Sequence, residues 1–321
     1  MTAKKIPRIP NRNTDTEDAQ MHDRKKLLFI MNPKSGVMQA PKYMSDIVGI
    51  FSGAGYLTQV LMTTGHGDAR DFAAEYGGEA DRVVVSGGDG TFNEVIDGLL
   101  SGGHDTPIGY IPAGSTNDFA HSVGLPKSIL DCALRAVSGR PVPVDIGSFN
   151  GRYFSYVASF GAFTSTTYSV PQNLKNIFGH AAYVMGGIKE LGNLRGIHTR
   201  ITLEKGTPDE QVHEGDYVLG AICNSRSIGG ILNLEKLDVD MNDGLMEILM
   251  IKMPKDIIEL NDIAISTLGG TFQSHQIETF SAANVTVEIE EDTHWTLDGE
   301  YEKGGNTCEI RTLKSAITLI R

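Results

Sequence analysis

The first half of the chain repeats one pattern four times: an apolar run of strand length followed by a segment suited to a helix. The apolar runs are residues 27–31, 56–63, 82–86 and 107–112, and the helical segments include 41–53, 68–76 and 92–100. Such alternation predicts a parallel sheet covered by helices. In open sheets of this kind, ligands bind where the carboxyl ends of the strands meet.

The pattern changes after Pro143. Two strands joined by Asn150-Gly151 form a predicted hairpin, because Asn-Gly favours the tight turns that hairpins need. Further strands are expected around 199–204, 216–223, 236–240, 245–251, 284–290 and 308–320, with helices near 174–192 and 255–268. We therefore divide the chain into a disordered tail (1–24), an α/β domain (25–143) and a mostly antiparallel β domain (144–321).

The charge of the chain argues against one class of partner, the nucleic acids. Its formal net charge is -12, which argues against broad nucleic-acid binding because no basic excess is present to neutralise phosphates. Apolar runs stay shorter than the roughly 20 residues of a membrane span, and the first residues lack an apolar signal core. Cys132, Cys223 and Cys308 lack metal-ligand spacing. We expect a cytoplasmic protein.

Three glycine-containing turns follow strands of the first domain: NPKSG (32–36), GGDGT (87–91) and PAGSTND (112–118). Glycine lets the backbone approach a phosphate, and N–H groups at a helix start bind anions. Thr91 with Glu94, and Ser115 with Asp118, have the spacing of capping boxes. The turns indicate a phosphate site at one sheet edge. The alternative is that each is a tight structural turn.

Asp89 stands in the middle of the second turn, where a carboxylate would repel a phosphate. The turns match neither the P-loop nor the G-x-G-x-x-G pattern, so no P-loop lysine supplies positive charge. An acid beside a polyphosphate is tolerated when Mg²⁺ lies between them. Asp118 is a second acid at the neighbouring turn, and we assign both to a metal-linked network. Alternatively, Asp89 only caps local backbone N–H groups.

The order and spacing of NPKSG, GGDGTFNE and PAGSTNDFA, with a later DGE at 298–300, resemble the diacylglycerol kinase catalytic domain family. That family also contains sphingosine and ceramide kinases, and the soluble bacterial diacylglycerol kinases are the most similar group. GGDGT alone also occurs in NAD kinases and phosphofructokinases. The resemblance implies an α/β domain like those of NAD kinase and phosphofructokinase, a β-sandwich second domain, and an active site in the cleft between them.

The resemblance also implies a set of site residues. Those that would line the ATP site are Asn32, Pro33, Lys34, Ser35, Gly36, Thr63, Gly88, Asp89, Gly90, Thr91, Phe92, Asn93, Glu94 and Ser115. Asp298 would be the general base, with Glu300 as its acidic partner and Asp89 as a third catalytic acid. From the residues alone, DGE is a hairpin turn. On an extended chain, Asp298 and Glu300 would face the same side.

A second acidic segment, LDVDMNDGLMEI (237–248), has the pattern of a turn entering a strand. By resemblance it would hold a structural Mg²⁺ through Asp240, Asp243 and the backbone of Leu245, linked to the nucleotide site by Asp118. Residues 175–200 combine helical apolar spacing with Lys175, Lys189 and Arg195. They would form an interfacial helix on the inner face of the membrane, or pack on the β domain.

These observations predict an ATP- and Mg²⁺-dependent lipid kinase that phosphorylates a lipid hydroxyl at the membrane surface, with diacylglycerol as the acceptor and phosphatidic acid as the product. A homodimer is implied by the resemblance. One alternative is an NAD kinase-like enzyme, which shares GGDGT and a β-rich second half. Another is a non-catalytic nucleotide or lipid sensor, in which the catalytic acids would be damaged. Asp89, Asp118, Asp298 and Glu300 are all present.

Overall fold

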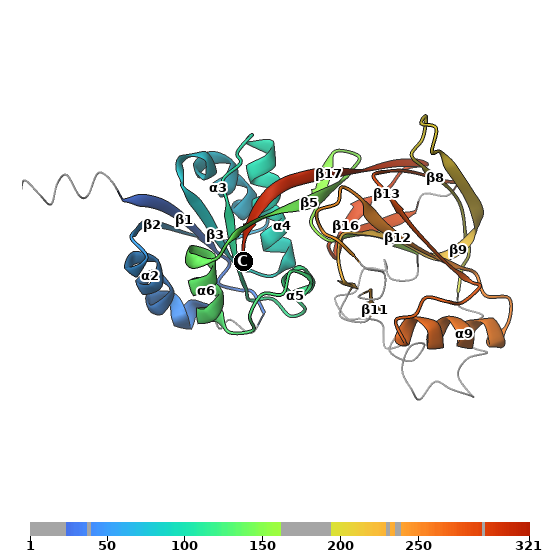
Figure 1. Ribbon diagram of the computed structural model, residues 1–321, viewed down its shortest axis with the longest axis horizontal. Coiled ribbons are helices and arrows are strands. Elements are labelled where there is room, and N and C mark those ends of the chain that lie inside the picture. The colour runs from blue at the N-terminus through green and yellow to red at the C-terminus, as the bar shows by residue number, and fades with distance from the viewer. Residues whose placement is uncertain (1–23, 37–39, 162–193, 229–231, 235–238, 291–292) are drawn as a thin grey trace, which may run out of the picture.

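The computed structural model describes residues 24–36, 40–161, 194–228, 232–234, 239–290 and 293–321. The tail before residue 24 and the helix predicted at 174–192 lie outside the described residues. Figure 1 shows two parts side by side, a helix-covered sheet and a group of antiparallel strands. Within the described part of the chain, none of the helices is long and apolar enough to cross a bilayer.

The first part contains the predicted parallel sheet. Its strands are β1 (Lys25–Met31), β2 (Tyr56–Met62), β3 (Arg82–Gly87) and β4 (Ile108–Pro112), in the order β2-β1-β3-β4. The helices are α2 (Met44–Gly53), α3 (Asp68–Tyr76), α4 (Asp89–Ser101), α5 (Asp118–Ser122) and α6 (Ile129–Ser138), with short 3₁₀ segments at Ala40–Tyr43 and Gly77–Glu79. Parallel pairing of β1 with both β2 and β3 confirms the α/β prediction.

Helices cover both faces of this sheet because its strands are apolar on both sides. Phe29 and Met31 pack in one core with residues of α2 and α6, while Leu28 and Ile30 pack in the other with residues of α3 and α4. All four side chains are buried. Continuous apolar runs are typical of parallel strands that are covered on both faces. The same packing leaves only the strand ends free to carry polar chemistry.

The second part is mostly antiparallel. Its strands are β5 (Pro141–Phe149), β6 (Arg152–Phe154), β7 (Val157–Gly161), β8 (Ile197–Leu203), β9 (Gln211–Cys223), β10 (Ser227–Ile228), β11 (Leu232–Asn233), β12 (Met246–Lys252), β13 (Ile277–Ala282), β14 (Asn284–Ile289), β15 (His294–Leu297), β16 (Glu300–Lys303) and β17 (Thr307–Ile320), and its helix is α9 (Ile257–Leu268). Trp295 lies at the centre of its core, with ring centroids 4.8 Å from both Phe149 and Phe160. The Asn150-Gly151 hairpin is confirmed between β5 and β6.

The last strand connects the two parts. β17 pairs with β14 at its start and with β5 along most of its length, and Leu319 then lies parallel to Ile108 of β4. Figure 1 shows it running from the β-rich part back to the first sheet. The last residues of β17 therefore belong to the sheet of the α/β part. A division of the chain at residue 143 assigns them to the β domain instead. That division itself stays a prediction.

The second part differs from the expected elements in two ways. β10, β11, β13, β15 and β16 were not predicted as strands. The strand expected at 236–240 is not present at its described residues, Val239 and Asp240, while 235–238 lie outside the described residues. From Val239 the described chain is irregular up to β12, because Asx-type turns at Asp240 and Asp243 bend the backbone there.

Candidate active site

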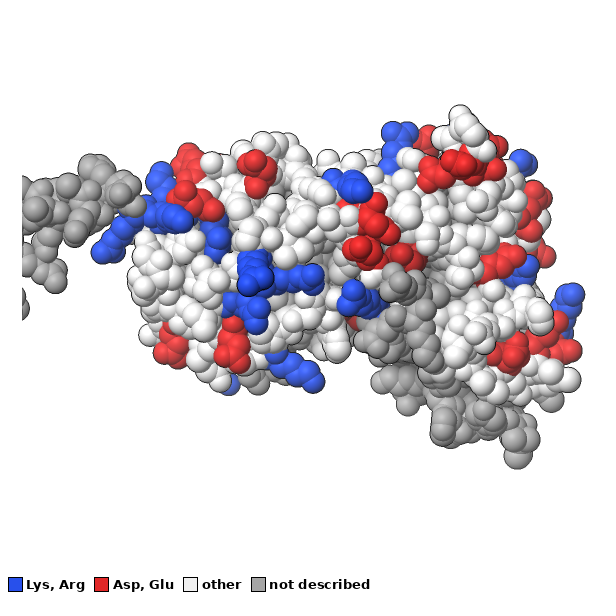
Figure 2. All heavy atoms as spheres, viewed as in Figure 1, with Lys and Arg blue, Asp and Glu red and all other residues white. Residues whose placement is uncertain are grey.

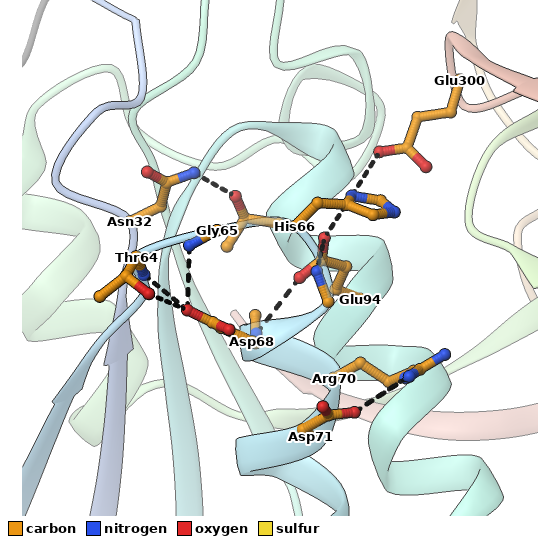
Figure 3. A network of polar contacts seen from close by, with 12 residues as sticks. Asn32, Thr64, Gly65, His66, Asp68, Arg70, Asp71, Glu94 and Glu300 are labelled. Atoms are coloured by element: carbon orange, nitrogen blue, oxygen red, sulfur yellow. Dashed lines mark hydrogen bonds and ion pairs between the residues drawn. The ribbon is translucent and has the colours of Figure 1, made fainter.

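The three glycine turns come together at the carboxyl ends of β1, β3 and β4. The side-chain amide of Asn32 donates to Thr91 Oγ1 at 3.0 Å, and Ser35 Oγ accepts from the backbone N–H of Gly88 at 3.2 Å. The contact between Asn32 and the start of α4 is drawn in Figure 3. The first and second turns are thus joined by hydrogen bonds, as expected for turns that follow neighbouring parallel strands.

Glycine is required at two of the closest approaches between these turns. Gly36 has a φ of +52°, and a Cβ added to it would lie 2.3 Å from the carbonyl oxygen of Ala113. A Cβ on Gly114 would lie 2.7 Å from the Cα of Gly88. Both distances are shorter than real Cβ contacts, so side chains here would push the turns apart. Their backbones can meet because these positions carry no side chain.

Asp89 lies between the second and third turns. Its carboxylate accepts hydrogen bonds from the backbone N–H groups of Asp118 at 3.1 Å and Phe119 at 3.3 Å, at the start of α5. It therefore does cap neighbouring backbone N–H groups, as the alternative interpretation held. Burial first, and then the charge of Asp118, raise the pKa of Asp89 to about 6. Burial disfavours the ionised carboxylate, and a cation beside it would stabilise that form. The metal-linked role of Asp89 stays a prediction.

The DGE segment forms the hairpin turn between β15 and β16, as its residues alone indicated. Asp298 and Gly299 have φ values of 52° and 85°, so the backbone is left-handed rather than extended. We expected Asp298 and Glu300 to share one side of an extended chain. This was wrong, because the chain is not extended at Asp298 and Gly299. Asn, Asp and Gly accept this conformation more readily than other residues, which explains the sequence at the turn.

The carboxylate of Asp298 is buried and fully hydrogen-bonded. One oxygen accepts from the backbone N–H and Oγ of Ser155, and the other from the backbone N–H groups of Tyr156 and Val157. Burial raises its pKa to about 6, although these hydrogen bonds act in the opposite direction. The charge of Asp298 also raises the pKa of Asp89, so the two acids lie within electrostatic range of each other.

Glu300 brings β16 against the first turn of α4. Its Oε2 accepts from Arg152 at 2.8 Å, and its Oε1 lies 3.1 Å from where a Cβ of Gly90 would stand. A residue of the distant DGE segment thus lies over the GGDGT turn. Figure 2 shows acidic side chains gathered over β16, where the two parts of the molecule meet.

The two predicted capping boxes are not formed. α4 begins at Asp89 with Gly88 as its N-cap, which places Thr91 inside the helix. Glu94 instead crosses to α3, where its two oxygens accept from the backbone N–H groups of Gly67 at 2.9 Å and Ala69 at 3.2 Å. Figure 3 shows this contact. Glu94 therefore satisfies the free N–H groups of a neighbouring helix rather than those of its own.

The second box fails for a similar reason. Asn117, not Ser115, is the N-cap of α5. Asn117 has a left-handed backbone, and its side-chain oxygen accepts from the backbone N–H of Gly114 at 2.8 Å. That hydrogen bond closes the third turn on itself. Ser115 is left exposed, where it can meet a ligand.

The remaining residues predicted to bind ATP differ in how far their side chains are exposed. Lys34 is exposed and Pro33 partly exposed, and Thr63 is buried at the end of β2, where its N–H donates to Met31. The side chain of Phe92 is fully buried against Tyr110 and Phe119, with ring centroids 4.4 and 4.5 Å away. Its ring packs the core, so only its backbone is available to a ligand. Asn93 is also buried, and its amide donates to the carbonyl of Tyr153 at 3.2 Å.

The predicted structural metal loop offers the oxygen donors that a hard cation prefers. The side chains of Asp240 and Asp243 are exposed, and each accepts one backbone N–H, from Asn242 and Leu245 respectively. Glu247, which was not predicted, is buried nearby, and its Oε2 has no hydrogen-bond partner within the described residues. Burial, then the charges of Asp243 and Asp240, raise its pKa to about 7. The loop thus fits Mg²⁺ chemically.

Asp118 does not share a three-ligand cluster with this loop among the described residues. Its helix is connected to the loop indirectly: Ser122 on α5 bonds Ser225 at 2.8 Å, and Arg226 donates to the carbonyl of Val239. The direct link through Asp118 stays a prediction.

Asp145 is a site residue that sequence reasoning missed. It is fully buried on β5, and its carboxylate accepts from the backbone N–H groups of Gly244 and Ser315, both at 2.6 Å. It therefore fixes the predicted metal loop to β17. An acid between Val144 and Ile146 in an apolar strand was a signal that could have identified it.

Comparison with known families finds a match for each of the two parts. The sequence pattern described as "Diacylglycerol kinase catalytic domain" matches residues 26–149. The pattern described as "YegS C-terminal NAD kinase beta sandwich-like domain" matches residues 158–321. The first match contains the three glycine turns, and the second contains DGE and the metal loop. The second match also identifies the antiparallel part as a β-sandwich.

Individual relatives resemble the chain over most of its length. A diacylglycerol kinase of Bacillus subtilis (strain 168) is 35% identical over 280 residues, covering 86% of this chain and 90% of the relative. One from Staphylococcus epidermidis is 30% identical and covers 87% and 86%. A crystal structure of a diacylglycerol kinase from Bacillus anthracis is 25% identical with a TM-score of 0.72, covering 93% of this chain and 97% of that one. Another from the same organism has a TM-score of 0.75 at 26% identity.

Proposed function

The chain belongs to the diacylglycerol kinase family, and we propose that it transfers the γ-phosphoryl group of ATP to the hydroxyl of diacylglycerol, giving phosphatidic acid. The observation that carries this proposal is the meeting of Glu300 with the GGDGT turn at Gly90. It brings the acids of the β-sandwich against the predicted phosphate-binding edge. Phosphoryl transfer depends chiefly on such positioning and on neutralising charge.

In the proposed reaction, the lipid oxygen forms a bond to the γ-phosphorus while the bond to the β–γ bridging oxygen breaks. The hydroxyl proton passes to Asp298. Each oxygen of Asp298 already accepts two hydrogen bonds, so one donor must yield when the proton arrives. The hydroxyl of Ser155, 2.8 Å away, can rotate its hydrogen elsewhere, whereas backbone N–H groups cannot. A pKa of about 6 suits an acceptor that is ionised at neutral pH.

The ATP phosphates are proposed to lie against the backbones of the three turns, with the fourteen predicted nucleotide-binding residues at the site and Phe92 contributing no side chain to it. Asp89 and Asp298 accept their hydrogen bonds from neutral N–H and O–H donors. Mg²⁺ would supply the balancing positive charge beside Asp89. A second Mg²⁺ would be held structurally by Asp240, Asp243 and the Leu245 carbonyl.

The lipid acceptor requires contact with a bilayer, so we propose peripheral association with the inner face of the membrane. Residues 175–193 of its predicted segment lie outside the described residues. The described remainder is not helical, because Arg195 is exposed in an irregular stretch and β8 begins at Ile197. Charge reversal at Lys189 and Arg195 should weaken binding to anionic liposomes, and unchanged binding would contradict the interfacial helix. A homodimer is likewise proposed by resemblance, and light scattering on the purified chain would test it.

The function is tested by offering the chain labelled ATP with three acceptors separately: diacylglycerol, a total lipid extract and NAD⁺. We expect label in phosphatidic acid. Label in NADP⁺ instead would support the NAD kinase-like alternative. Nucleotide binding without transfer to any acceptor would support the sensor.

A further inference from the structure

A histidine and two glutamates converge at the junction between the two parts of the molecule. His66, in the loop before α3, has its Nδ1 2.9 Å from Glu94 Oε1 on α4 and 3.9 Å from Glu300 Oε1 on β16. The three candidate ligand atoms all lie within 4.8 Å of one another. Figure 3 shows the imidazole between the two carboxylates. This histidine has no part in the proposed phosphoryl transfer.

The separations of these atoms are close to those of ligands around one metal ion, and the widest, up to 4.8 Å, would shorten when an ion binds. Zinc–nitrogen and zinc–oxygen bonds of about 2.0–2.2 Å place neighbouring ligand atoms roughly 3 to 3.6 Å apart. The distances of 2.9 and 3.9 Å from His66 Nδ1 bracket that range. We propose that His66, Glu94 and Glu300 form a binding site for a divalent transition-metal ion of the zinc class. An imidazole nitrogen favours such an ion over Mg²⁺, which prefers oxygen ligands.

The surroundings of the cluster fit this role. Contacts to Gly67 and Ala69 orient the carboxylate of Glu94, and Arg152 holds Oε2 of Glu300, leaving its Oε1 toward His66. Such outer contacts orient metal ligands in known sites. The side chain of His66 is 76% exposed, so an ion can enter from solvent and complete its coordination with water.

The chain contains a matched control for this geometry. His198 also lies between two acids, but its Nδ1 faces Asp216 at 2.9 Å while its Nε2 faces Glu214 at 3.3 Å. The two ring nitrogens point in different directions, so these acids cannot join the imidazole around one ion. At His66, by contrast, the same nitrogen faces both carboxylates.

The test is calorimetric titration of Zn²⁺ into the zinc-free full-length chain. The buffer contains millimolar Mg²⁺ and no nucleotide. Wild type and His198→Ala should each bind one zinc ion with the same affinity. His66→Ala should bind zinc at least about tenfold more weakly. Both substitutions are at exposed side chains, so the folds should be retained. Superimposable titrations for His66→Ala and wild type would overturn the site, as would an equal loss in His198→Ala.

A second readout concerns turnover and rests on the proposed function. Zinc bound here would hold Glu300 away from the reaction, so low Zn²⁺ should inhibit lipid phosphorylation by wild type and by His198→Ala more than by His66→Ala. Equal inhibition of all three would contradict this effect. Because the binding titration needs no catalysis, it confirms or overturns the zinc site even if the proposed function fails.

Discussion

The carboxylate of Asp298 accepts two hydrogen bonds from Ser155, one from its backbone N–H at 2.5 Å and one from its Oγ at 2.8 Å. This pairing fixes the β15–β16 turn to the turn between β6 and β7. It also defines which donor can yield if Asp298 takes up a proton. The structural and chemical roles of Asp298 can therefore be separated by substitution.

Asp298→Asn should lower lipid kinase turnover by about 10²- to 10⁴-fold, because an amide cannot accept the hydroxyl proton. ATP binding, measured calorimetrically, should persist, since Asp298 contacts the β6–β7 turn rather than the glycine turns. The circular dichroism spectrum serves as the check on folding. Full turnover in this variant would exclude Asp298 as the base.

The pH dependence of turnover should identify Asp298 as the group that ionises. Burial raises its pKa to about 6, so it must lose its proton to act as a base, and kcat/KM should fall as pH drops through about 6. Ser155→Ala removes a hydrogen bond that stabilises the carboxylate, so the acid limb should move to higher pH. Ser159→Ala, on the neighbouring strand, should leave it in place. An acid limb that is identical in all three proteins would assign it to another group.

Gly114→Ala should weaken ATP binding. The added Cβ would meet Gly88 Cα at 2.7 Å and separate two of the glycine turns. Overpacking of this kind costs about 1–3 kcal/mol, which would show as a loss of affinity, stability or both. Gly49→Ala on α2, where no atom lies within 4 Å of the new Cβ, is the control. Equal ATP affinity for the two variants would argue against the turns as the nucleotide site.

Glu94→Ala should destabilise the fold by about 1 kcal/mol, as the loss of a helix cap does. Its carboxylate holds the backbone N–H groups of Gly67 and Ala69 at the start of α3. Urea denaturation would measure the change, with Glu79→Ala, at an exposed residue after α3, as the reference. If both variants unfold at the same urea concentration, the cross-helix cap contributes nothing.

Asp243→Asn should reduce the rise in melting temperature that Mg²⁺ produces, because an amide binds the ion less strongly than a carboxylate. Asp209→Asn, exposed in the β8–β9 turn, controls for the loss of one surface charge. The same Mg²⁺-dependent shift in Asp243→Asn and wild type would remove this loop as the structural metal site.

The parallel half of the fold could be predicted from local patterns because each element there follows its own periodicity. The apolar run 27–31 lies within β1, and the helical spacing of 68–76 corresponds to α3. β15 and β16 were missed because each is only four residues long, too short for a clear periodic pattern. β15 is held by pairing with β7, where Trp295 lies opposite Phe160, and β16 pairs with β15 in turn, long-range contacts that no local pattern encodes.

The candidate site was likewise predictable where local patterns define it, and not where distant segments meet. Convergence of the glycine turns follows from their positions after parallel strands. The partners of Glu94 and Asp145 were not visible, although an acid within the apolar strand marked Asp145 as unusual, since each carboxylate accepts from backbone N–H groups of a distant segment. The capping-box spacing at Thr91 and Glu94 was a local signal that tertiary packing overrode, because α4 begins before Thr91.

We propose that this chain phosphorylates a lipid alcohol in a site built from the glycine turns and DGE. The most direct measurement is the transfer of label from [γ-³²P]ATP to diacylglycerol in anionic vesicles with Mg²⁺, comparing wild type with Asp298→Asn. We predict labelled phosphatidic acid from wild type and almost none from the variant. Absence of any labelled lipid with wild type, or equal labelling by the two proteins, would contradict the account.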